Sequence, residues 1–127
     1  MGVSHWKGMA TVQTDQSFVV FKDLAYGYRA AWKLMESYRM RLSEAKKAFN
    51  IHNIISRWAP PNENDTRAYI NHVVRLSGIP EFQLLTPPGI RKDQVMKVIE
   101  AMTCVENGIS MEEVPREEIE KGYSLTF

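Results

Sequence analysis

The sequence contains a single cysteine, Cys104, among its 127 residues. One thiol cannot form an internal disulfide, so the fold needs no oxidising compartment. Because Cys104 lies in an apolar helical pattern, we expect it to fill the core rather than to act as a nucleophile. No segment approaches the roughly 18 consecutive apolar residues of a membrane span. The N-terminus also lacks the pattern of a secretory signal peptide, which predicts a protein that is cytoplasmic as synthesised, with no membrane partner.

Neither sign of charge dominates the chain. Lys and Arg total 16, and Asp and Glu total 15. This balance argues against nucleic-acid binding that depends on bulk positive charge, so no nucleic-acid partner is expected. The hydrophobic fraction of 44% is ordinary for a globular protein, and a chain of this length suits one domain with a single core.

The sequence also lacks the motifs of metal and cofactor sites. Its three histidines, His5, His52 and His72, do not pair with one another, with Cys104 or with a carboxylate at a recognised ligand spacing. No glycine-rich phosphate loop, dinucleotide-binding fingerprint or nucleophile elbow is present. We therefore expect no metal and no organic cofactor, and we expect His52 and His72 to lie on polar helix faces.

Residues 1–22 are β-like, whereas the rest of the chain is predicted to be helical. A polar turn over residues 14–17 precedes the apolar run Phe18-Val19-Val20-Phe21, which predicts a short β-hairpin or two-stranded ribbon. Beyond it, apolar residues recur at spacings of three and four, as on the buried faces of helices. The sequence therefore predicts a mainly α (α+β) fold, one domain over residues 1–127, with a β-ribbon at 1–22 and a helical body at 23–122.

Five segments show the helical pattern. They are one of about twenty residues that begins near residue 23, one over 51–58, one over 66–77, one that includes 95–105, and one over 116–121. Asn50 is the expected N-cap of the second helix. Gly78, Gly108 and Gly122 are expected to end the third, fourth and fifth helices.

The connection between the second and third helices carries the residues best suited to chemistry. Pro60 and Pro61 stop the second helix and stiffen the loop that follows. The candidate site residues of this loop are Trp58, Asn62, Glu63, Asn64 and Asp65. A carboxyl group held against an apolar surface has a raised pKa and can act as a general acid. Aromatic rings, amides and carboxylates are also common contacts of sugars, so the loop is a candidate glycan site.

The same residues have a structural interpretation that needs no function. Asn64, Asp65 or Thr66 would cap the third helix, Glu63 would be a solvated charge, and Trp58 would belong to the core. Glu106, near the end of the fourth helix, could be catalytic, although a solvated helix end is the simpler interpretation of its position. From the residues alone, we favour the structural interpretation over the functional one.

The order of motifs resembles a known family. The motifs are Trp6-Lys7-Gly8, Asp15 to Phe21, Tyr26-Gly27-Tyr28-Arg29-Ala30, Tyr38, Ile54 to Pro61, Glu63-Asn64, Thr66, Tyr69-Ile70 and Gly78. Together they are similar to the phage-associated, lysozyme-like proteins often labelled phage structural protein in bacterial prophages. The resemblance covers residues 6–108, and its most specific part is the Trp-Ala-Pro-Pro-x-Glu-Asn-x-Thr run.

This resemblance implies a lysozyme-like domain that is virion-associated or directed at the cell wall. The chain differs from the family at its start, where Met1 to His5 replace an Arg-x-x-Asn-Asn-Pro-x-Asn-Ile segment. We expect either a longer native chain or a protein that has lost this segment. In lysozyme-like folds the segment helps to line the sugar cleft, so the active site could be incomplete.

Two functions remain open on this basis. The first is a glycoside hydrolase or transglycosylase-like protein that binds peptidoglycan and cleaves its β-1,4 bond. In it, Glu63 would be the general acid, and Asp65 would orient a water or stabilise positive charge. Trp58 would shape an apolar wall, Asn62 and Asn64 would contact sugar, and Arg29 would position a carboxylate or brace the loop. The alternative is a non-catalytic phage structural module whose partners are other virion proteins.

Overall fold

The computed structural model describes residues 24–62 and 64–127, and this part of the chain is mainly helical. Its elements are α3 (Leu24–Glu44), α4 (Ile51–Trp58), α5 (Thr66–Ser77), α6 (Lys92–Asn107), the short 3-10 helix η3 (Met111–Glu113) and α7 (Arg116–Thr126). Among the described residues there is no β-strand. The expected β-ribbon at residues 1–22 and the candidate residue Glu63 lie outside the described residues.

The helix ends predicted from capping residues are confirmed at three places. The side chain of Asn50 accepts a hydrogen bond from the backbone N–H of Asn53 at 2.8 Å, so it caps α4. Gly78 follows α5 with φ of 73°, and Gly108 follows α6 with φ of 64°. These left-handed conformations cost glycine little, which is why a glycine stands at each of these two helix ends.

The predicted end of the last helix at Gly122 is wrong, because α7 continues to Thr126. Gly122 is buried inside the helix, and a Cβ atom on it would lie 2.7 Å from backbone atoms of Tyr28 and Arg29 in α3. The glycine therefore permits close packing of two helices instead of ending one. The helical body consequently extends beyond residue 122.

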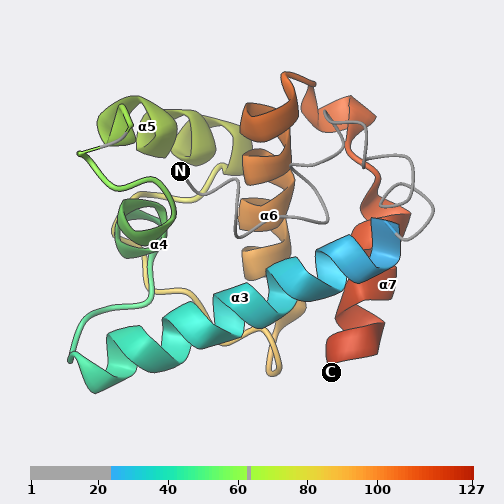
Figure 1. Ribbon diagram of the computed structural model, residues 1–127, viewed down its shortest axis with the longest axis horizontal. Coiled ribbons are helices and arrows are strands. Elements are labelled where there is room, and N and C mark those ends of the chain that lie inside the picture. The colour runs from blue at the N-terminus through green and yellow to red at the C-terminus, as the bar shows by residue number, and fades with distance from the viewer. Residues whose placement is uncertain (1–23, 63) are drawn as a thin grey trace.

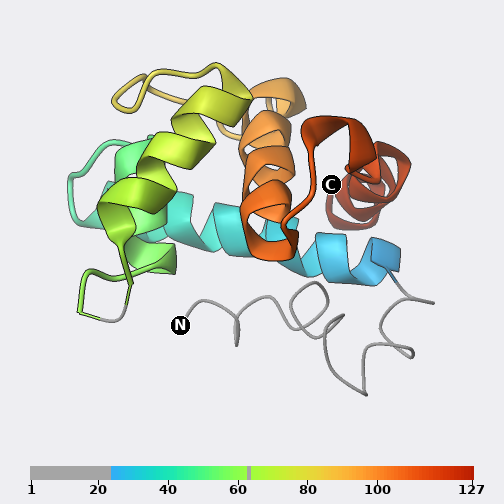
Figure 2. The ribbon, with the colours of Figure 1, turned by 90° about the horizontal axis from the view of Figure 1, so that it is seen from above.

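Helix α6 stands in the middle of the molecule, with other helices on either side of it (Figure 1). Helix α7 packs on the N-terminal part of α3, while α4 and α5 lie toward the other end of α3 (Figure 2). Trp32 of α3 is fully buried and donates a hydrogen bond from Nε1 to the carbonyl of Ile119 at 2.9 Å. Cys104 is also buried in the core, as its apolar surroundings in the sequence predicted.

Candidate functional site

A shallow depression of about 490 Å³ lies between α4 and α5, beside the connection that the sequence singled out. Two elements and one loop supply its lining. The lining residues are His52, Ser56, Pro61, Asn64, Asp65, Thr66, Arg67 and Ile70. The depression therefore combines charged, polar and apolar side chains in one place, and most of its lining residues are polar or charged.

Local hydrogen bonds shape the loop at residues 59–65. The backbone N–H of Asn64 donates to the carbonyl of Pro60 at 3.1 Å, and the Asn64 side-chain amide donates to the same oxygen at 3.2 Å. The hydroxyl of Thr66 donates to the carbonyl of Ala59. These bonds join the two ends of the loop, so Asn64 occupies a defined place in the lining of the depression.

Asp65 directly precedes α5 and is exposed in the lining of the depression. Its Oδ1 accepts a hydrogen bond from the backbone N–H of Ala68 at 3.1 Å, which makes it the N-cap of the helix. The structural role considered for Asp65 is thus confirmed. A side chain that caps a helix can still face a ligand, so its proposed chemical role is a separate question. Asn62 is exposed on the same loop.

A charged cluster stands at one side of the depression. Arg67 donates from Nη1 and Nη2 to the two carboxylate oxygens of Glu81, at 2.8 and 3.0 Å. The same carboxylate lies 2.7 Å from Nδ1 of His52. Hydrogen bonds from Arg67, with a smaller contribution from His52, hold the pKa of Glu81 below its usual value. Glu81 therefore connects α4, α5 and the segment after α5 through one side chain.

A second polar cluster connects α4, α5 and α6. Tyr69 donates its hydroxyl to Glu106 Oε2 at 2.8 Å, and Trp58 Nε1 lies 3.0 Å from the Tyr69 oxygen and 3.2 Å from the same carboxylate. Burial, followed by the charge of Glu106, raises the pKa of Tyr69. Trp58 is fully buried, which confirms the core interpretation of this residue. Glu106 is half-buried, so it is not the solvated helix end that its sequence position indicated.

Arg29 is not brought to the loop. It lies near the start of α3, and its Nε donates to the carbonyl of Leu125 in α7 at 3.4 Å. The α4–α5 connection lies on the other side of the molecule from α7 (Figure 1). Arg29 therefore contacts the C-terminal helix, away from Asn64 and Asp65.

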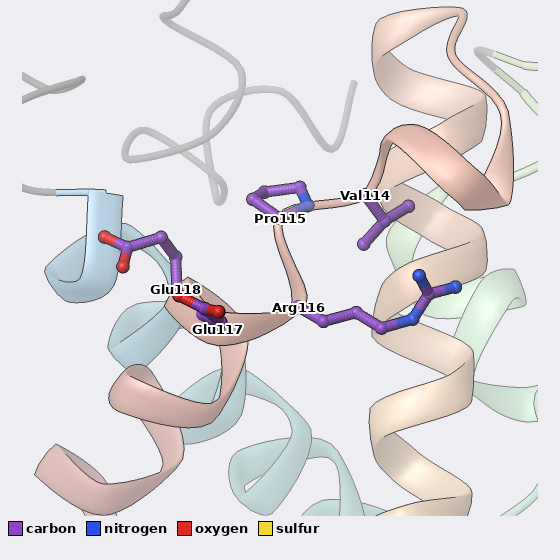
Figure 3. A pocket seen from close by; sticks show the side chains of 5 residues that line it. All are labelled: Val114, Pro115, Arg116, Glu117 and Glu118. Carbon is purple, nitrogen blue, oxygen red and sulfur yellow. The ribbon is translucent and has the colours of Figure 1, made fainter.

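Another hollow, of about 400 Å³, lies at the start of α7 and is lined by Val114, Pro115, Arg116, Glu117 and Glu118. Figure 3 shows the Arg116 side chain extending toward α6. There its Nε donates to the buried carboxylate of Glu100 at 3.1 Å. Because its one basic side chain is already paired and the helix start beside it is acidic, this hollow is a weaker candidate for a ligand site.

The described part of the chain contains no group of three or more His, Cys, Asp or Glu side chains arranged to hold a metal ion. None of its helices combines the length and the apolar character that crossing a membrane requires.

The sequence did not predict the contact between His52 and Glu81 beside the depression, because these residues are separated by 29 positions and no motif links them. We considered Glu106 but not its contacts with Trp58 and Tyr69. The one available signal was spacing, since His52 and Ser56 are four residues apart and lie on one face of α4.

The chain is similar to Protein P5 of Pseudoalteromonas phage PM2. The two are 34% identical over 126 residues, which cover 99% of this chain and 72% of the length of that protein. No protein-family model and no solved structure matches the chain, so the lysozyme-like fold stays a prediction. A similarity of this extent and coverage shows common descent, and the chain therefore belongs to the phage-related family of Protein P5 of Pseudoalteromonas phage PM2.

Proposed function

We propose that this phage-related protein binds the glycan strands of peptidoglycan and cleaves their β-1,4 bonds. The observation that carries the proposal is the position of Asn64 and Asp65 in the lining of the depression between α4 and α5. An amide and a carboxylate beside apolar Pro61 and Ile70 are groups that can bond sugar hydroxyls and pack on a sugar ring. The relationship to a phage protein is compatible with a virion-associated role at the cell wall.

Glu63 is the proposed general acid, because glycosidic cleavage requires a carboxyl group that donates a proton to the leaving oxygen. It adjoins Asn64 in the sequence. Asp65 is the proposed second carboxylate, and it would stabilise positive charge on the sugar or orient a water. Glu106 is the reserve candidate for the general acid, and two donors fix its Oε2 atom beside the end of α4.

The test is digestion of purified sacculi by the protein and by three variants. We expect the wild type to release soluble fragments and Glu63→Gln to release none, since the amide keeps the shape but loses the acidic proton. Glu112→Gln changes an exposed carboxylate of η3 and is the matched control, which should keep full activity. Mass spectrometry of the fragments separates hydrolysis from transglycosylation. Release that survives Glu63→Gln but not Glu106→Gln would move the acid role to Glu106.

A non-catalytic phage structural module is the second candidate function. Two observations favour it, namely the complete burial of Trp58 and the capping of α5 by Asp65, since both residues then have structural roles. In this case the partners would be virion proteins or further copies of the chain. Failure to bind or digest sacculi, together with oligomers in solution, would support this function over the first.

A further inference from the structure

The depression between α4 and α5 is close to neutral, although charged side chains line it. Arg67 is neutralised by its two hydrogen bonds to Glu81. Asp65 is directed to the start of α5, where it accepts the bond from Ala68. An added anion would meet two carboxylates here, and an added cation would meet the guanidinium. The lining therefore favours an uncharged ligand over a charged one.

His52 contributes an aromatic ring to the lining, and this ring contacts two neighbouring residues. Its Nδ1 lies 2.7 Å from Glu81 Oε2, and its ring lies against that of Phe82, with centroids 4.9 Å apart and planes inclined by 30°. The backbone N–H of His52 also donates to the carbonyl of Glu81 at 3.1 Å. Two contacts of the ring, with Glu81 and Phe82, thus orient the imidazole before any ligand arrives, and the backbone bond fixes the position of His52 beside them.

Nε2 is the ring nitrogen of His52 that does not face Glu81. When Nδ1 carries the proton that faces Glu81, Nε2 is an acceptor, and the other residues of the described chain offer it no hydrogen-bond partner. Asn64 adds an amide to the same lining, and Ile70 and Pro61 add apolar surface. An uncharged ligand that offers hydroxyl donors and an apolar face matches these groups, and a pyranose ring has both.

We propose that this depression is a saccharide subsite that takes one uncharged sugar ring, with His52 as a binding residue and with Glu81 and Phe82 as positioning residues. The inference deepens the proposed action on glycan strands and rests on it for the identity of the sugar. It adds residues from outside the α4–α5 loop, and it places part of the glycan on the α4–α5 side of the molecule. The role of Phe82 is to support the imidazole ring, not to touch the sugar itself.

The test uses chitotetraose, a neutral oligosaccharide of N-acetylglucosamine, titrated into the ¹⁵N-labelled protein and followed by NMR. We expect the amide signals of His52, Ser56, Asn64 and Arg67 to move together along one binding curve. Inorganic phosphate at the same concentration is the anionic probe, and it should leave these signals in place. Signals that move only elsewhere, or that respond at least as strongly to phosphate, would overturn the proposal.

Two matched pairs of variants separate binding from folding. His52→Ala should weaken chitotetraose binding by at least about tenfold, whereas His72→Ala, an exposed histidine on α5 outside the depression, should not. Phe82→Ala should weaken binding by a smaller factor, and Leu84→Ala should leave it unchanged. Phe82 and Leu84 are 65% and 69% exposed in the same segment, so neither variant threatens the core. Unchanged affinity in both His52→Ala and Phe82→Ala would refute the assignment.

The outcomes also separate this inference from the proposed function. If the protein digests sacculi but chitotetraose does not bind at the depression, the proposed enzymatic function is supported and the saccharide subsite is refuted. If chitotetraose binds at the depression but the protein does not digest sacculi, the saccharide subsite is supported and the catalytic proposal is refuted.

Discussion

Gly122 determines how closely α7 can approach α3. A methyl group at this position would lie 2.7 Å from backbone atoms of Tyr28 and Arg29, which cannot rotate away as a flexible side chain could. Gly122→Ala gains about 1 kcal/mol of helix propensity but adds an overpacking cost of about 1–3 kcal/mol. We expect a net loss of unfolding free energy in urea denaturation. The control is Ser124→Ala, an exposed position of the same helix, and a more stable Gly122→Ala variant would contradict the close approach.

Glu81 makes the stability of the protein depend on pH in the acid range. Its pKa lies below the usual value of 4.5, mainly because of the bonds from Arg67. Since the folded pKa is depressed, the contribution to stability is present above pH 4.5 and is lost as the pH falls through the folded pKa. We therefore expect the difference in unfolding free energy between wild type and Glu81→Gln to shrink as the pH falls below 4.5. A difference that does not shrink as the pH falls would refute the coupling.

At the scale of elements, Asp65 combines a confirmed structural role with a proposed chemical one. Asp65→Ala removes the N-cap of α5 and should cost about 1 kcal/mol of unfolding free energy. Asp65→Asn retains an oxygen that can cap and should cost much less. If Asp65→Asn keeps its stability but loses the digestion of sacculi, the carboxylate has a chemical role as well. Equal destabilisation by both variants would show that the charge, rather than the hydrogen bond, stabilises the helix.

The described helices were largely predictable because their ends depend on local chemistry. Asn50, Gly78 and Gly108 act through their own backbone neighbours, and these effects can be read from the sequence. Gly122 was misinterpreted because its neighbours, Tyr28 and Arg29, are about ninety positions away in the chain. A glycine that ends a helix and one that admits another helix have the same sequence signature.

The candidate site was predictable only in part, for the same reason. The loop with Asn64 and Asp65 stood out because its double proline and polar run are contiguous. The pair of His52 and Glu81 belongs to no local pattern, since the two residues meet only after α5 has folded back on α4. For Trp58 the sequence offered both a ligand-binding and a core interpretation, and its complete burial agrees with the core interpretation that we favoured.

At the scale of the whole molecule, one hydrophobic cluster joins the two sides of the described chain. Trp32 lies on the side formed by α3 and α7, where it contacts Tyr123 edge-on with ring centroids 4.9 Å apart. Trp58 lies on the side formed by α4, α5 and α6, where its Nε1 donates to Tyr69 and Glu106. Both side chains are fully buried in the same cluster.

Cooperative unfolding of this cluster can be tested with these two tryptophans. Trp6→Phe combined with Trp32→Phe leaves Trp58 as the fluorescent probe, and Trp6→Phe combined with Trp58→Phe leaves Trp32. Each variant is compared with its own far-ultraviolet circular dichroism, because loss of a buried tryptophan lowers stability without changing cooperativity. We expect the fluorescence and circular dichroism midpoints in urea to coincide within each variant. The reason is that residues of α3, α6 and α7 belong to one hydrophobic cluster, so these helices should unfold together. Separate midpoints would show that the α3–α7 pair and the α4–α5–α6 group unfold independently.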